Sequence, residues 1–176
     1  MITITPIRIR EHYVLVSELM RLLHLSEKAF FPKTADWDSI ATNYMQHVID
    51  MQETCDGVCL LATVNNQPAG FLFAYLEEAD ESRIEDYSGD TLYVSDGYVH
   101  AEYRRQGIYR MMNEALEKIY IQKGIRRIVR YTLTNNYRMQ QFLATQNYVP
   151  VRLVYEKWLS PNGKEVSPLF PPEHQS

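Results

Sequence analysis

The sequence is poor in cysteine and contains no long apolar run. Its two cysteines, Cys55 and Cys59, have a C-x-x-x-C spacing, which is neither that of a zinc knuckle nor the C-x-x-C of redox enzymes. We interpret them as reduced thiols packed in or beside a strand. No apolar stretch reaches the length that crosses a membrane, and the first ten residues lack the charged start and long apolar core of a signal peptide. We therefore expect a cytoplasmic protein with no membrane partner.

The sequence also lacks metal-binding spacing and an excess of positive charge. None of its five histidines belongs to an H-E-x-x-H or other metal motif, so we expect no metal ion. The formal net charge of -4 and the pI near 5.7 argue against a surface that neutralises a nucleic acid. A small anion can still bind to an acidic protein at a local basic turn.

Such a turn lies within residues 96–110, which run from an apolar strand through a basic segment with one glycine, Gly107, into an amphipathic helix. The first N-H groups of a helix have no partner inside the helix, and the helix dipole adds partial positive charge there. Arg104, Arg105 and Arg110 supply counter-charge for an anion. The segment therefore predicts an anion-binding cradle, as is typical of phosphate sites at helix N-termini.

Apolar periodicity predicts a mixed α/β chain. We expect strands over residues 4–9, 57–64, 69–75, 91–99, 126–133 and 148–159. We expect helices over residues 14–25 and 37–51, a helix whose apolar face runs from Ile108 to Ile119 and which Lys123 and Gly124 end, and a short helix that Asn135 or Asn136 caps and Asn147 ends. The strand, helix and strand from 91 to 133 form a βαβ unit, so these two strands should be parallel. Residues 1–166 are expected to form one domain and residues 167–176 a Pro-rich tail.

These residues resemble the GNAT superfamily of acyl-CoA-dependent N-acetyltransferases. The family has a loop of form [QR]-x-x-G-x-[GA] after a strand, which is similar to residues 104–109 here, except that Tyr109 occupies the last place. Its N-x-x-A-x-x-F-Y helix start resembles the run that begins at Asn136. The order of elements agrees up to about Leu159. The resemblance implies a mostly antiparallel sheet with one parallel pair splayed apart for coenzyme A, and helices on both faces.

The resemblance also implies that coenzyme A binds at the basic turn. Backbone amides of residues 105–110 would hold the pyrophosphate, with help from basic side chains. The residues expected to contact coenzyme A are Tyr98, Val99, His100, Arg104, Arg105, Gln106, Gly107, Ile108, Tyr109, Arg110, Asn136 and Met139.

The strand over residues 92–100 is expected to lie along the thioester. Gly97 fits this role, because an isolated glycine in a strand often marks a bulge or a close backbone approach. Its alternative role is that of a packing glycine. The N-H of Val99 would donate to the thioester carbonyl oxygen as an oxyanion donor.

Acetyl transfer requires a neutral amine, although an alkyl amine resembles lysine with a pKa of about 10.4. The first candidate for the general base is Asp96, and the second is Glu77 or Glu78 at the end of the preceding strand. Each carboxylate could instead be an ordinary solvated group.

Two positions depart from the family pattern. Leu143 stands where many members have a tyrosine that protonates the coenzyme A sulfur. A thiol, with a pKa of about 8.5, can leave without a dedicated acid. Tyr109 replaces a small residue, and we expect its ring to pack on the protein or to cover the adenine side of the ligand.

The leading hypothesis is an enzyme that moves acetyl from acetyl-CoA to a primary amine by direct attack in a ternary complex. The alternative is a non-catalytic acyl-CoA-binding or sensing module of the same fold. A protein that binds another phosphorylated ligand is a third hypothesis, although G-x-G-x-x-G and P-loop motifs are absent. The acceptor could be a small molecule or a peptide amine, no nucleic acid partner is expected, and a homodimer is possible.

Overall fold

The computed structural model describes residues 1–78 and 89–157 of the chain. The chain divides into two compact units, Met1–Tyr131 and Thr132–Ser176. In the described residues, no helix is long and apolar enough to span a membrane, and no group of three or more His, Cys, Asp or Glu side chains could hold a metal ion.

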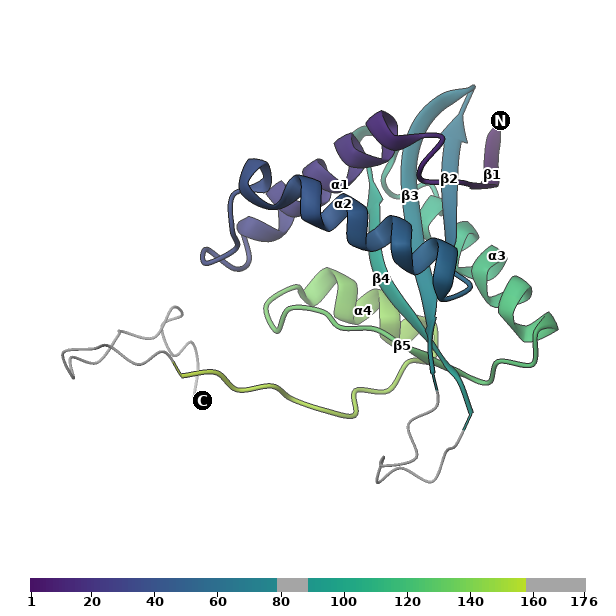
Figure 1. Cartoon of the computed structure of the whole chain (residues 1–176). Coiled ribbons are helices and arrows are strands. Elements are labelled where there is room, and N and C mark those ends of the chain that lie inside the picture. Colours follow the sequence, from purple (N-terminus) through teal and green to yellow (C-terminus); the bar gives the residue numbers. More distant parts are fainter. Residues whose placement is uncertain (79–88, 158–176) are drawn as a thin grey trace. The chain divides into compact units, whose positions relative to one another are not determined.

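The first unit is built on a mixed sheet of five strands among the described residues (Figure 1). The strands are β1 (Ile2–Ile7), β2 (Val58–Val64), β3 (Gln67–Glu77), β4 (Thr91–Val99) and β5 (Arg127–Val129), and their order in the sheet follows the sequence. Neighbours are antiparallel except β4 and β5, which are parallel. The parallel pairing predicted for the βαβ unit is thereby confirmed.

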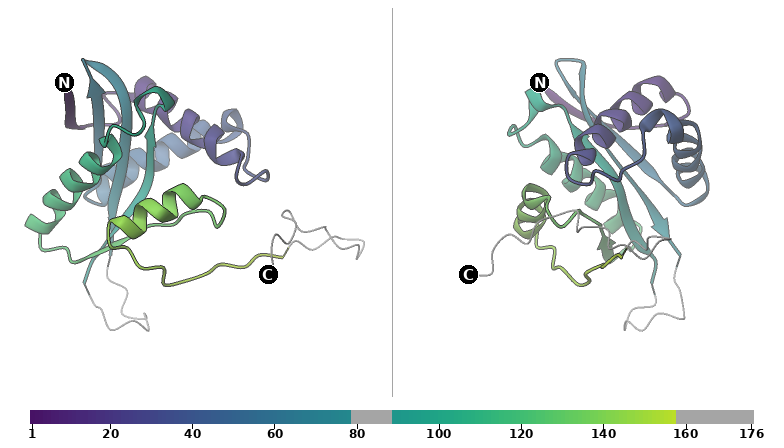
Figure 2. Two further views of the ribbon diagram at one scale, coloured as in Figure 1. Left: turned by 180° about the vertical axis from the view of Figure 1, so that it is seen from behind. Right: turned by 90° about the vertical axis from the view of Figure 1, so that its left-hand side faces the viewer.

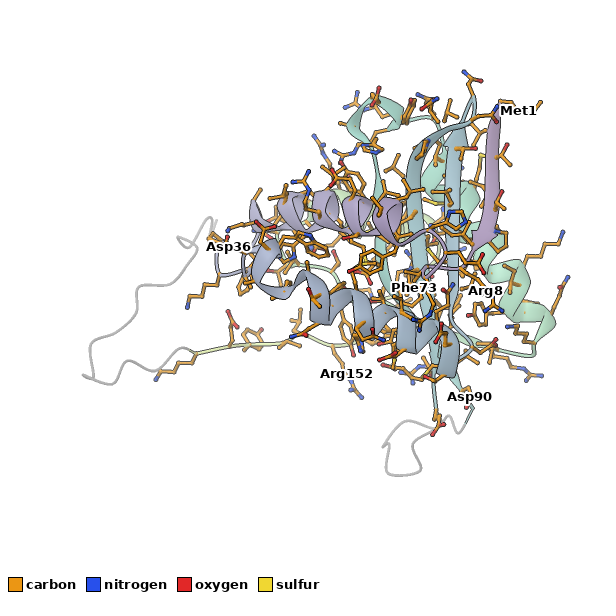
Figure 3. All side chains as sticks on the ribbon, turned by 45° about the horizontal axis from the view of Figure 1, so that its top comes forward. Met1, Arg8, Asp36, Phe73, Asp90 and Arg152 are labelled. Atoms are coloured by element: carbon orange, nitrogen blue, oxygen red, sulfur yellow. The ribbon has the colours of Figure 1, made fainter. Side chains whose placement is uncertain are left out.

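Helices cover both faces of this sheet. Helices α1 (Tyr13–Lys28) and α2 (Trp37–Thr54) lie on one face, and α3 (Ile108–Gln122) lies on the other (Figure 2). Each helix has an apolar stripe that a sheet can bury. Phe73, labelled in Figure 3, belongs to the core between the sheet and α1 and α2, whereas Leu72 faces α3. The mixed α/β fold expected from the sequence is confirmed.

Strand β4 contains a bulge at Ser95. Phe73 of β3 is opposite Asp96 and Ala74 is opposite Val94, so Ser95 is one extra residue. Because side chains alternate between the two faces of a strand, one extra residue reverses the alternation beyond it. The bulge therefore turns Asp96 toward α1 and α2, where Tyr44 of α2 contacts it.

The parallel pairing of β4 with β5 is short. It joins residues 91–93 to residues 127–129, and β4 continues to Val99. The strand predicted over residues 126–133 was too long, because Arg130 leaves the ladder to bond with α3. Beyond Tyr93, the β5-facing edge of β4 has no strand partner among the described residues.

The second unit contains α4 (Tyr137–Thr145). Asn136 caps it, since its Oδ1 accepts from the N-H of Met139 at 3.2 Å, and Asn147 follows in a left-handed conformation with φ of 63°. Both features agree with the prediction. The strand predicted over residues 148–159 is wrong for residues 148–157, which are without regular structure in the described chain. They contain Pro150, which cannot donate to a ladder. The rest of that strand, the predicted tail and residues 79–88 lie outside the described residues.

Candidate functional site

The basic turn connects β4 to α3 through a short 3-10 helix, Ala101–Tyr103. Arg105 has φ of 63° and Gly107, the N-cap of α3, has φ of 78°. Glycine adopts this left-handed conformation at little cost. A Cβ atom built on Gly107 would meet nothing within 4 Å. The turn is therefore shaped by its glycine and faces open space.

Several N-H groups of this turn lack a backbone partner. Within the part of the chain that the structure describes, the N-H groups of residues 105–108 and of Arg110 have no backbone acceptor. The regular hydrogen bonds of α3 begin at the cap, where the N-H of Met111 donates to the Gly107 carbonyl at 3.0 Å. Unsatisfied N-H groups at the positive end of a helix dipole are a suitable environment for a phosphate.

Arginine side chains add to the positive charge of the turn. Arg105 and Arg110 are exposed. Arg104 instead bends back to β4, where its Nε donates to the Val99 carbonyl at 2.9 Å and its guanidinium lies 5.5 Å from the centre of the Tyr98 ring. Arg104 therefore fixes the end of β4 relative to the turn in addition to contributing charge.

The end of β4 has one paired edge and one open edge. The N-H of His100 donates to the Ala69 carbonyl at 2.9 Å. Because successive residues of a strand alternate in the direction of their polar groups, the N-H and C=O of Val99 face the opposite edge. Arg104 takes the Val99 carbonyl there. The N-H of Val99 thus faces the side where pairing with β5 has stopped.

Gly97 allows other side chains to approach the backbone of β4 closely. The bulge expected near it lies two residues earlier, at Ser95. A Cβ on Gly97 would lie 2.6 Å from Tyr109 Oη and 2.8 Å from Leu72 Cδ1. The Tyr109 ring therefore packs on the backbone of β4, as one of the two expectations for this residue had it.

Sequence reasoning missed two partners of Tyr109. Arg130 Nη1 donates to Tyr109 Oη at 3.3 Å, and the second Nη of Arg130 donates to Asn113 Oδ1. Asn113 Nδ2 in turn donates to the Tyr109 carbonyl at 2.6 Å, and Asn113 is buried. The only signal in the sequence was an arginine ending the apolar run of β5. This network holds the chain beyond β5 against α3.

Asp96 is a buried carboxylate, with 7% of its surface exposed. Its Oδ1 accepts from Tyr44 Oη and its Oδ2 from Ser95 Oγ, both at 2.6 Å. Burial raises the pKa of this carboxyl, and the two hydroxyl donors only partly offset that effect. No ion pair among the described residues includes Asp96. The electrostatic effect of the nearby His47 also lowers the pKa of Asp96, by less than the two hydroxyl donors do.

The remaining carboxylates differ in their surroundings. Glu78 is exposed, just beyond the end of β3 at Glu77. Glu27 of α1 was not predicted. Its pKa is raised by burial and further by the neighbouring charge of Asp96. Asp96 is thus the most enclosed of the predicted catalytic groups, and Glu27 lies within its electrostatic range.

The predicted coenzyme A residues divide between the two units. The stretch from Tyr98 to Arg110 is continuous in the first unit and combines an open strand edge with the basic turn. His100 lies beside Tyr98, with ring centres 5.5 Å apart. Asn136 and Met139 belong to the second unit, where they form the cap of α4.

Comparison with known proteins agrees with this architecture. Residues 18–148 match the model of the acetyltransferase (GNAT) family. By sequence, no curated protein gives a significant match.

Solved structures share the fold. A possible acetyltransferase from Clostridium difficile 630 is 18% identical, with a TM-score of 0.67 over 90% of this chain and 97% of that chain. A putative acetyl transferase from Pyrococcus furiosus is 16% identical, with a TM-score of 0.70 over 90% of this chain and 100% of that chain. The aminoglycoside enzyme AAC(6')-Iy, solved with the bisubstrate analogue CoA-S-monomethyl-acetylneamine, is 17% identical, with a TM-score of 0.64 over 91% of this chain and 99% of that chain. At these identities the likeness concerns the fold alone.

Proposed function

The chain belongs to the acetyltransferase (GNAT) family, and from that membership we propose that it transfers an acetyl group from acetyl-CoA to a primary amine. One observation carries the proposal. The edge of β4 loses its β5 partner after Tyr93 and leads directly into a turn in which the N-H groups of residues 105–108 and of Arg110 have no backbone acceptor among the described residues. This arrangement offers hydrogen bonds to an extended ligand that ends in phosphates.

The residues of the turn fit coenzyme A. The pyrophosphate would be held by the backbone N-H groups of residues 105–110, with the exposed Arg105 and Arg110 adding charge. The open space over Gly107 leaves room for an anion to approach the backbone. When bound, acetyl-CoA supplies an acetyl group activated as a thioester of a good leaving thiol. Asn136 and Met139 of the second unit remain predicted contacts.

Two groups of β4 would act on the reaction. The N-H of Val99 would donate to the carbonyl oxygen as negative charge develops on it. The carboxylate of Asp96 would accept a proton from the ammonium of the acceptor and so leave the neutral amine that attacks, and its raised pKa makes it a stronger base than an ordinary aspartate. The new C-N bond forms as the C-S bond breaks, and the thiol can leave as a thiolate because no acid is required at Leu143.

Attack within a ternary complex, without an acyl-cysteine on the sheet, is supported by the state of Cys59 in β2. Cys59 is buried, and burial raises the pKa of its thiol, so it is not a nucleophile. An amine acceptor agrees with the ligand of AAC(6')-Iy, an analogue that joins coenzyme A to an acetylated neamine.

The experiment is to incubate the full chain with acetyl-CoA and a panel of primary amines and to measure free thiol. We expect amine-dependent thiol release, and calorimetry should show coenzyme A binding that Gly107→Glu abolishes. Binding without release for any amine would favour the non-catalytic acyl-CoA-binding module. Wild-type protein that binds no coenzyme A would contradict both functions.

A further inference from the structure

A row of aromatic rings crosses the first unit beside the open edge of β4. Tyr75 of β3 and Tyr93 of β4 are directly opposite in the ladder, with ring centres 5.4 Å apart and planes at 88°. Tyr131, two residues beyond β5, lies 5.4 Å from Tyr93 at 63°. At the other end, His47 of α2 lies 6.5 Å from Tyr75 at 89°. We call Tyr75, Tyr93 and Tyr131 the tyrosine row.

The tyrosine row runs from the core to the surface. Tyr75 packs on the buried Phe73 at 5.9 Å, and Tyr75 and Tyr93 are half-buried. Tyr131 is 69% exposed. A ring that only filled the core would be covered, and a graded series of partly exposed rings is typical of a binding face.

The row also lies where β4 and β5 separate. Tyr93 is the last residue of β4 that pairs with β5, and its partner there is Val129. Tyr131 follows two residues later, after the chain has left the ladder. The row therefore adjoins the first residues of the open edge, three positions before Asp96.

Negative charge surrounds these rings. Burial is the main cause of the raised pKa of Tyr75 and Tyr93, and the carboxylates of Glu77 and Asp96 raise both further. The phenols therefore stay neutral near pH 7, and each ring face carries the partial negative charge of its π system. Asp96 has no ion-pair partner among the described residues.

We propose that the tyrosine row binds the acceptor of the reaction, and that this acceptor is a cationic amine attached to a flat apolar group. The inference rests on the proposed acetyl transfer. The apolar group would lie on the faces of Tyr93 and Tyr131. Its ammonium would be attracted by the ring faces and by the carboxylate of Asp96. A small aliphatic amine would gain the attraction for its ammonium but not the contact of a flat apolar group with the rings.

The probes that test this are 2-phenylethylamine, its uncharged analogue 2-phenylethanol, and ethylamine. Binding is measured by NMR titration of protein with isotope-labelled tyrosine rings. The variants are Tyr131→Leu, whose exposed position tolerates the change, Tyr93→Leu, and Tyr93→Phe, which keeps the ring. Tyr13→Leu is the control, because Tyr13 is a 42% exposed tyrosine at the start of α1, outside the row.

We expect 2-phenylethylamine to shift the ring signals of the tyrosine row. Its Kd should rise about fivefold in each leucine variant of the row and stay within about twofold in Tyr93→Phe and Tyr13→Leu. The proposal would be overturned if either leucine variant bound the amine as tightly as the wild type. If Tyr93→Leu does not fold, Tyr131→Leu alone decides. The proposal would also be overturned by 2-phenylethanol binding as tightly as the amine, or by no shift in the wild type.

Thiol release from acetyl-CoA is measured in parallel, so that the two proposals fail separately. Amine binding that is lost in the leucine variants, without any thiol release, would support the acceptor site and contradict acetyl transfer. Thiol release with an unchanged KM for 2-phenylethylamine in the leucine variants would support acetyl transfer and overturn the acceptor site.

Discussion

Gly107 and Gly124 lie at the two ends of α3 and can be compared directly, because their backbone conformations are alike. They have φ of 78° and 83°, and a Cβ on either would meet nothing within 4 Å. Replacement of either glycine by alanine should therefore lower the free energy of unfolding by about 1 kcal/mol, because alanine is strained in this conformation. Urea unfolding measures this cost.

Only Gly107 caps the turn with unsatisfied N-H groups. Gly107→Ala should therefore also raise the Kd for coenzyme A, by about tenfold, since a methyl group and any local shift of the backbone weaken several N-H contacts together. Gly124→Ala should leave this Kd unchanged. Equal Kd values for the two variants in calorimetry would count against the turn as the phosphate site.

Asp96 should make stability depend on pH. Its folded-state pKa is raised, mainly by burial, so the folded state favours the protonated carboxyl. That contribution is fully present below the unfolded pKa of about 3.9 and is lost as pH rises through the folded pKa. The free energy of unfolding of the wild type should thus fall relative to Asp96→Asn as pH rises above about 4.

Urea unfolding of both proteins at a series of pH values between 4 and 8 measures this difference. The groups that act on the Asp96 carboxyl are Tyr44, Ser95 and His47, and Asp96 in turn acts on Glu27, whose own pKa is raised. The variants His47→Gln and Glu27→Gln, each made in both backgrounds, remove the contributions of these two neighbours. Parallel stability curves for the wild type and Asp96→Asn would contradict a raised pKa.

At the level of elements, side-chain contacts of Tyr109 link β4, α3 and the segment that follows β5. Gly97 leaves room for Tyr109, and Tyr109 is bonded to Arg130 beyond β5. Gly97→Ala should destabilise the protein by about 1 to 3 kcal/mol, because its Cβ would lie 2.6 Å from Tyr109 Oη and 2.8 Å from Leu72 Cδ1.

If Tyr109 is the main obstacle, Gly97→Ala should cost less in a Tyr109→Ala background. A double-mutant cycle by urea unfolding gives this coupling, which should be at least about 1 kcal/mol. Additive effects of the two changes on the free energy of unfolding would show that the Cβ added by Gly97→Ala clashes with Leu72 and not with Tyr109.

Elements with one strong local signal could be predicted from sequence. The bounds of β4 were predicted as Thr91–Val99, and the cap of α4 at Asn136 was among two alternatives. The bulge was expected near Gly97 and is at Ser95, because a register shift is set by the partner strand. Arg130 and Asn113 could not be predicted together, since 17 residues separate them and only the fold makes them neighbours.

At the level of the whole molecule, both cores of the described chain lie in the first unit, one on each face of the sheet. Every buried residue lies within Met1–Tyr131, and none lies within residues 132–157. The strand predicted from residue 148 is wrong because alternating apolar residues form a strand only where a neighbouring strand bonds to their backbone groups. The local sequence pattern does not say whether such a neighbour exists.

The second unit should therefore not fold by itself. Its helix α4 has nine residues, which is too short to persist alone in water. A peptide of residues 132–157 should show the circular dichroism of an unfolded chain. The full chain, if residues 1–166 form one domain as the sequence predicts, should unfold in a single calorimetric transition with equal calorimetric and van't Hoff enthalpies. A separate low-temperature transition, or a helical peptide, would show that α4 belongs to an independent unit and that coenzyme A binding must be complete without Asn136.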